Sequence, residues 1–260
     1  MPTNNQITRN IGGQTNSGPG TVLENLKHNN PAFYHQLFDD CDKFTAADWV
    51  VTATGAATET IRANIDGGIL RMQNTGALND LVSIQYAGGT GAVNQTFQFD
   101  PTSPKDVLFA CSIATDSALN ANILVGLAIA DTTPIASLPA TGMFIFKPAA
   151  SLFPQGYMQN ASVGTLTAQA QTPMADNTFI DLAIFYSAYD GNCIMYMGTP
   201  GVTGGNTPAS QVVASQFRLP APLTLPVASL APTISLSNGT AAARLLDVDW
   251  WYAAKARRSG

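Results

Sequence analysis

From Trp49 onward the chain consists of short runs rich in apolar residues, and several of these runs alternate apolar and polar positions with a period of two. In the stretch 231–252, Ile234 and Leu236 alternate with hydroxyl side chains, Asn238-Gly239 interrupts the pattern, and a second alternating run follows from Leu245. A period of two is typical of a strand with one buried face, and an Asn-Gly pair suits the positive φ of a tight turn. The two runs predict a hairpin-like unit whose apolar face needs a second sheet to cover it.

The second run also predicts which tryptophan is in the core. Strict alternation places Leu246, Val248, Trp250 and Tyr252 on the core face and turns Trp251 outward, where we interpret it as an interface anchor. A β-bulge in this run would exchange the two tryptophans.

Short apolar runs separated by turn residues continue through the chain and predict a sandwich or barrel. The expected strands cover residues 49–54, 68–73, 81–86, 96–99, 107–113, 123–130, 143–147, 157–160, 165–170, 179–186, 193–197 and 212–219. The run 123–130 is apolar on both faces, which predicts a central strand, with the small residues Gly126 and Ala128 at points where another backbone approaches closely. Residues 189–192, Tyr-Asp-Gly-Asn, predict a hairpin turn.

The first residues of the chain differ from the rest. Residues 1–20 are almost devoid of apolar side chains, so this stretch buries too little to offset its entropy unless something holds it. Short helical turns are expected in 22–26 and 33–37, interrupted by Pro31. The predicted organisation is an extended N-terminal arm with short helical turns over 1–37, a β-sandwich over 38–254 and a basic tail over 255–260.

We expect the arm to be held by a neighbouring subunit. The candidate interface residues are Ile7, Ile11, Val22, Leu23, Leu26, Phe33, Tyr34 and Trp251.

Charge is scarce for a chain of this size. Only 11% of the 260 residues are charged, against roughly 25% in typical soluble domains. A surface this neutral favours extensive contact with other protein, because interface cores are depleted in charge. The alternative is a secreted or carbohydrate-handling β-protein. The net charge of −5 favours neither nucleic acid nor an anionic membrane as partner.

Three cysteines, Cys41, Cys111 and Cys193, cannot all pair within one chain and have no CxxC spacing. They are expected to be core-filling thiols in a protein made in a reducing cytoplasm. The N-terminus lacks the apolar core of a signal peptide, and the longest apolar run, 123–130, is too short to cross a bilayer.

The residues needed for common hydrolytic chemistry are missing. The chain has two glutamates, Glu24 and Glu59, so a glycosidase strand with several glutamates cannot form. Asp247 and Asp249 share a face in the alternating pattern, but the polar side of an amphipathic strand explains both. The histidines, His28 and His35, lie before the predicted sandwich, and neither GxSxG nor a P-loop is present. We therefore predict no enzymatic activity, no cofactor and no metal site, including at the Asp39-Asp40-Cys41-Asp42 stretch.

Three segments carry a resemblance to a known family: FDDCDKFTAADWVVTATGA at 38–56, TFIDLAIFYSAYDGNCIMYM at 178–197 and LAPTISLSNGTAAARLLDVDWWYAAK at 230–255. Together they resemble the concanavalin-A/laminin-G-like jelly roll, an all-β sandwich of two antiparallel sheets. More narrowly, they resemble virion proteins of tailed bacteriophages. The resemblance implies a capsid decoration (cement) protein, synthesised in the host cytoplasm, that forms a homo-trimer on the capsid surface and clamps the major capsid protein.

Two other functions compete with this one. A glycan-binding module of a phage fibre or tail would use exposed aromatic residues such as Trp251, Tyr189 or Tyr157. A degenerate glycanase is the third hypothesis, and measurable hydrolysis of a glycan would support it.

Overall fold

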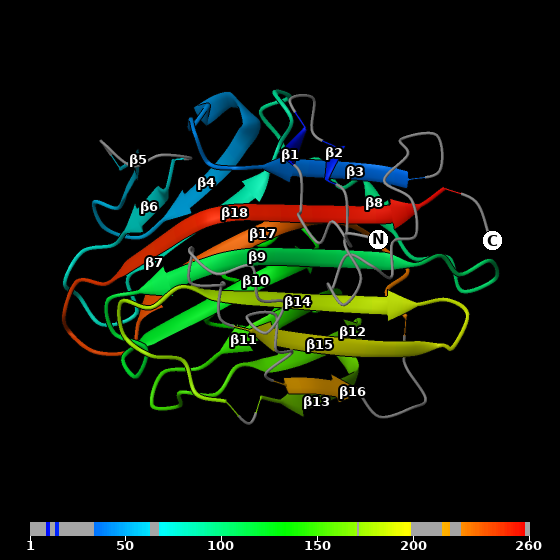
Figure 1. Ribbon diagram of the computed structural model, residues 1–260. Helices are drawn as coiled ribbons and strands as arrows, with labels where there is room; N and C mark the ends of the chain where they lie inside the picture. The colour runs from blue at the N-terminus through cyan, green and yellow to red at the C-terminus, as the bar shows by residue number, and fades with distance from the viewer. Residues whose placement is uncertain are drawn as a thin grey trace, which may run out of the picture.

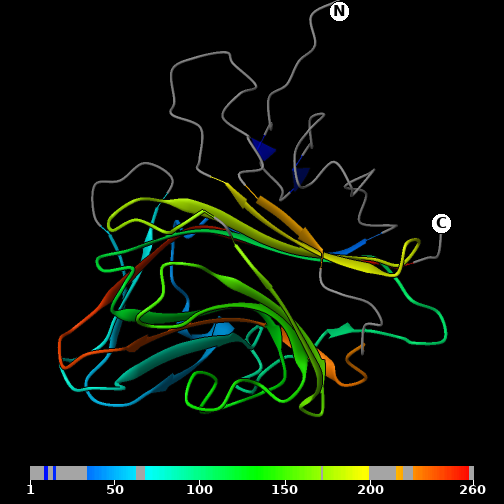
Figure 2. The ribbon, with the colours of Figure 1, turned by 90° about the horizontal axis from the view of Figure 1, so that it is seen from below.

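The computed structural model describes residues 9–10, 14–15, 34–62, 68–170, 172–198, 215–218 and 225–257. Over these residues the chain forms two antiparallel sheets of eight strands each, packed face to face (Figures 1 and 2). This confirms the predicted all-β jelly-roll sandwich. Nearly all strands expected from the alternation are present, several with shifted ends.

The first sheet, called the β9 sheet, has the order β16-β15-β14-β9-β18-β6-β5, and β3 also pairs with β18. Its strands are β3 (Tyr34–Asp39), β5 (Thr58–Ile61), β6 (Leu70–Gln73), β9 (Val107–Thr115), β14 (Ile180–Ser187), β15 (Asn192–Gly198), β16 (Ser215–Arg218) and β18 (Leu245–Ala256). The turn at 189–192 joins β14 and β15 in register, as predicted for a hairpin.

The second sheet, called the β10 sheet, has the order β13-β12-β11-β10-β17-β7-β4, and β8 also pairs with β17. Its strands are β4 (Trp49–Ala53), β7 (Leu81–Tyr86), β8 (Phe97–Gln98), β10 (Ala121–Ala128), β11 (Gly142–Lys147), β12 (Gln155–Asn160), β13 (Val163–Gln169) and β17 (Ser229–Asn238). The predicted central strand, β10, lies between β11 and β17.

Three small elements lie outside the two sheets. The short strands β1 (Arg9–Asn10) and β2 (Gln14–Thr15) pair with each other, and Figure 2 shows them on the outer side of the β9 sheet. A 3-10 helix, η2 (Ala46–Asp48), leads into β4.

The main core lies between the sheets and is built from every second residue of each strand. In β9 these are Val107, Phe109, Cys111 and Ile113, which face the matching positions of the β10 sheet. All three cysteines are buried free thiols, as predicted. Burial raises the pKa of each thiol, so these groups act as small apolar side chains.

The predicted hairpin at Asn238-Gly239 is wrong. β17 belongs to the β10 sheet and β18 to the β9 sheet, so the chain crosses from one layer to the other here. Neither residue adopts a positive φ. A Cβ on Gly239 would collide with the Cβ of Ala149 and lie 2.8 Å from the Asn120 carbonyl oxygen, so close approach is what requires glycine.

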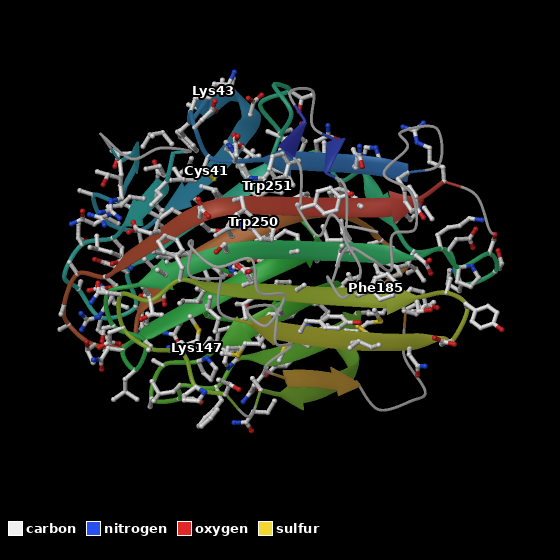
Figure 3. All side chains as sticks on the ribbon, in the orientation of Figure 1. Cys41, Lys43, Lys147, Phe185, Trp250 and Trp251 are labelled. Atoms are coloured by element: carbon white, nitrogen blue, oxygen red, sulfur yellow. The ribbon has the colours of Figure 1, made fainter. Side chains whose placement is uncertain are left out.

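The assignment of the two tryptophans is also wrong, because β18 contains an irregularity. Val248 pairs with Ile113 and Trp250 pairs with Ser112, so the register shifts at Asp249. The extra residue reverses the alternation that follows it. Trp251 therefore enters the core at 2% exposure, and Trp250 points to the outer face, where it is partly buried (Figure 3).

The boundaries predicted for the arm and the tail change as well. Tyr34 to Leu37 form part of a strand instead of a helical turn, because β3 pairs with β18 from Tyr34↔Ala256 to Asp39↔Trp251. Pairing with a long strand outweighs a weak local helical preference. The sandwich thus includes residues from 34, and Lys255 lies in β18 rather than in the tail.

Candidate functional site

A second apolar layer lies on the outer face of the β9 sheet. It consists of the residues that alternate with the core positions on four neighbouring strands. This outer cluster comprises Leu108, Ala110, Ala183, Phe185, Ile194, Tyr196, Tyr252 and Ala254, with Tyr34, Phe38 and Trp250 packed against it. A sandwich needs apolar side chains only on its inner faces, so this layer is additional to what the fold requires.

The strand register aligns the cluster in rows across the sheet. One row joins Ala183, Ala110, Tyr252 and Phe38, each the direct partner of the next. The adjacent row joins Phe185, Leu108 and Ala254. Directly opposed side chains in an antiparallel pair are close enough to contact each other, so the rows form a continuous surface.

The outer cluster is buried within a single chain. Leu108 and Ala254 are 0% exposed, and Tyr252 is 1% exposed. The Tyr252 hydroxyl donates a hydrogen bond to Gln36 Oε1 at 3.1 Å, which satisfies its polar end. Burial, together with the nearby Tyr34, raises the pKa of Tyr252 far above its usual range. Side chains on this face are therefore shielded from water, like those of an interior.

The other sheet has a smaller outer cluster that a described loop covers. Leu124, Phe144 and Tyr157 pack there beneath Ile135 and Leu138, which lie in the loop between β10 and β11. The Phe144 and Tyr157 rings stack at 5.4 Å. For the cluster on the β9 sheet, every described residue that packs in it belongs to that sheet itself. The two faces thus differ in that only one has a described covering segment.

Polar groups border the outer cluster at one end. Asp181 pairs with Ser112 across β14 and β9, and Ser112 pairs with Trp250. Burial of the Asp181 carboxyl raises its pKa to about 6, and the charge of Asp249 adds to this effect. An ionised carboxylate is disfavoured at this position.

Replacing this carboxyl with a neutral amide should stabilise the protein at neutral and higher pH. Because the folded-state pKa is raised, stability falls as pH rises from about 4 through 6 and stays low above that. Asp181→Asn should raise the free energy of unfolding by about 2–3 kcal/mol at about pH 8, with little change near pH 4. Urea unfolding at both pH values measures this. Asp190→Asn, at an exposed turn, is the matched control, and an equal gain at both pH values would contradict the assignment.

Further along the same face, Asp247 is fully engaged in ion pairs. Arg71 donates to both carboxylate oxygens at 2.8 Å, and Arg62 donates to Oδ2 at 3.0 Å. Asp249 lies at the register shift, so the two aspartates do not follow one uninterrupted alternation. This arrangement matches the interpretation of Asp247 as part of a polar strand face.

The candidate interface residues predicted from the sequence lie in different parts of the structure. Tyr34 packs against the outer cluster, while Trp251 is wrong as an interface anchor because it lies in the core. The remaining candidates lie outside the described residues: Ile7, Ile11, Val22, Leu23, Leu26 and Phe33. The outer cluster itself did not follow from the alternation of apolar and polar residues. The available signal was the run of apolar residues on both faces of 107–114 and 182–186, which indicates strands covered on both sides.

The aromatic residues proposed for glycan binding are dispersed. Tyr157 is 8% exposed and stacked on Phe144, and Trp251 is in the core. Tyr189 is 97% exposed in the β14–β15 turn. The described structure therefore leaves Tyr189 as the exposed member of this set.

The described residues hold no group of three or more His, Cys, Asp and Glu side chains arranged to bind a metal. Asp39 instead accepts a hydrogen bond from the Cys41 backbone N–H at 2.8 Å, as expected for a capped loop. His35 lies in β3 with its ring centroid 5.0 Å from that of Phe97, and burial lowers its pKa. Within the same described ranges, no helix has the length and apolarity needed to span a membrane.

Comparisons with known proteins identify the fold. No family model matches the sequence, and no curated protein matches it. Among solved structures, the chain is similar to peanut lectin bound to a nine-residue peptide, with a TM-score of 0.57 and 10% identity over 87% of this chain and 99% of the lectin. It is also similar to lectin II from Ulex europaeus (TM-score 0.55, 12% identity, 85% and 98% covered) and to the seed lectin of Lotus tetragonolobus (TM-score 0.54, 10% identity, 86% and 100% covered). The chain therefore has the concanavalin-A-like fold of legume lectins, and identities this low establish the fold alone.

Proposed function

We propose that the chain is a structural virion protein without enzymatic activity, a decoration protein that binds the major capsid protein on the outer surface of a tailed-phage head. The observation that supports this most is the outer cluster of the β9 sheet. An apolar layer outside a complete sandwich needs protein to cover it, and in a trimer the covering segment can come from a neighbouring copy.

Two further features support the proposal. The chain is poor in charge, at 11%, which suits a surface that lies against protein. The resemblance of three segments to phage virion proteins supports the same role. In this role the chain acts as a homo-trimer, and buried surface between subunits provides the stabilisation.

Carbohydrate binding is the second candidate function, and the fold comparisons favour it. Legume lectins of the same fold include one solved in complex with galactose. On this chain the exposed ring of Tyr189 is the described aromatic best placed to stack on a sugar. Fold alone does not fix function, so this candidate depends on a direct binding measurement.

Two measurements separate the candidates. Under the structural proposal, mass spectrometry of density-gradient-purified particles of the encoding virus should detect the chain, and a glycan array should show no binding. Under the lectin proposal, the array should give a defined sugar signal that Tyr189→Ala abolishes. A chain that is absent from the particles and binds a sugar through Tyr189 would contradict the structural proposal.

A further inference from the structure

We infer that the outer cluster of the β9 sheet is a docking surface for the chain's own N-terminal segment, residues 1–33. This goes beyond the proposed function, because the contact would exist whether or not the chain is part of a virion. The described strands form the surface. Residues 1–33 are the occupant because they lead directly into β3 of the same sheet.

A covering segment must lie over the outer cluster. Side chains stand roughly perpendicular to a sheet, so neighbours in the same sheet shield their flanks but not their ends. Leu108 and Ala254 are nevertheless 0% exposed within a single chain. Every described hydrophobic member of the cluster belongs to the β9 sheet, so a further segment is needed to cover the ends of these side chains.

The connectivity of the chain places its N-terminal segment within reach of this face. Residues 1–33 lead directly into β3, whose Tyr34 and Phe38 already pack against the cluster. A segment of that length can extend on the order of 100 Å, while the five strands from β15 to β3 span about 20 Å. The described strands β1 and β2, within this segment, lie on the outer side of the same sheet (Figure 2).

The composition of residues 1–33 is compatible with docking on an apolar surface. Residues 1–33 contain three charged side chains, Arg9, Glu24 and Lys27, so little charge would need to be desolvated on docking. The same segment carries apolar side chains suited to this surface: Ile7, Ile11, Val22, Leu23, Leu26 and Phe33. Such a polar segment gains order only by burying these few side chains against a preformed apolar surface.

A site-specific cross-link in the full-length chain tests this docking. Phe185 lies on the outer face of β14 and belongs to the cluster, paired with Leu108 of β9 (Figure 3). The photoreactive Phe185→p-benzoylphenylalanine should, on irradiation, cross-link to a peptide within residues 1–33, identified by mass spectrometry. A cross-link within one chain or between two copies supports the docking equally. Tyr189→p-benzoylphenylalanine, just beyond the same strand and fully exposed, is the matched control and should give at least tenfold fewer such products.

Two further results decide the outcome. If Phe185→p-benzoylphenylalanine melts well below the parent chain, Tyr196→p-benzoylphenylalanine on the same face replaces it. Cross-links to residues 199–214 alone, or to the sheet strands of a second copy alone, would overturn the inference, as would equal products from the cluster and control positions. The presence of the chain in purified particles and its binding on a glycan array are measured independently of these cross-links, so failure here and failure of the proposed function are distinguishable.

Discussion

Trp251→Ala should lower the free energy of unfolding by about 3–5 kcal/mol. The Trp251 ring is 2% exposed and packs edge-on against Trp49, with ring centroids 5.4 Å apart, and tilted against Tyr86 at 6.0 Å. Truncation removes a large buried apolar area and leaves a cavity between the two sheets, because the surrounding strands relax only partly.

The neighbouring tryptophan provides the control for this prediction. Trp250 lies on the outer face and is partly buried, so Trp250→Ala should cost about 1 kcal/mol. Urea unfolding of both variants, followed by circular dichroism, measures the difference. A larger loss from Trp250→Ala than from Trp251→Ala would mean that β18 runs without the register shift at Asp249.

Gly126→Ala should lower the free energy of unfolding by about 3 kcal/mol or more. Gly126 lies in the central strand β10 with φ +154, and a Cβ there would be 2.5 Å from Phe144 Cα and 2.6 Å from the Met143 carbonyl oxygen. These are backbone atoms of β11 that move only if the strand pairing is disturbed, so overpacking adds to the unfavourable φ.

Gly191→Ala separates the steric contribution at Gly126 from the contribution of the unfavourable φ. Gly191 also has a positive φ, +61, but a Cβ there meets no atom within 4 Å. Its substitution should therefore cost about 1 kcal/mol from backbone conformation alone. Thermal and urea unfolding of both variants give the comparison, and equal losses would contradict a steric requirement at Gly126.

The inner half of the sandwich was predictable from the sequence because each strand carries a clear local signal. The expected close approach at Gly126 is confirmed by the short distances to β11. Two errors arose where a long-range contact overrides a local pattern. The register shift at Asp249 reverses the faces of β18, and alternation alone cannot locate a bulge. Tyr34 to Leu37 became a strand because β18 offers a pairing edge that the local sequence does not reveal.

The outer cluster was harder to predict, for a different physical reason. Leu108 and Phe185 lie in runs that are apolar at nearly every position, and such runs indicate burial on both faces without showing what covers the second face. Their role depends on register across β14, β9 and β18, which only the folded arrangement provides. The sequence instead drew attention to Trp251, whose large ring is typical both of a core and of an interface anchor.

The central claim is that this chain functions by assembling with other copies of itself and with other protein, and the mass of the purified full-length protein tests it most directly. Native mass spectrometry should find a homo-trimer, three times 27.3 kDa. A parent protein that is monomeric at every concentration tested would contradict the claim.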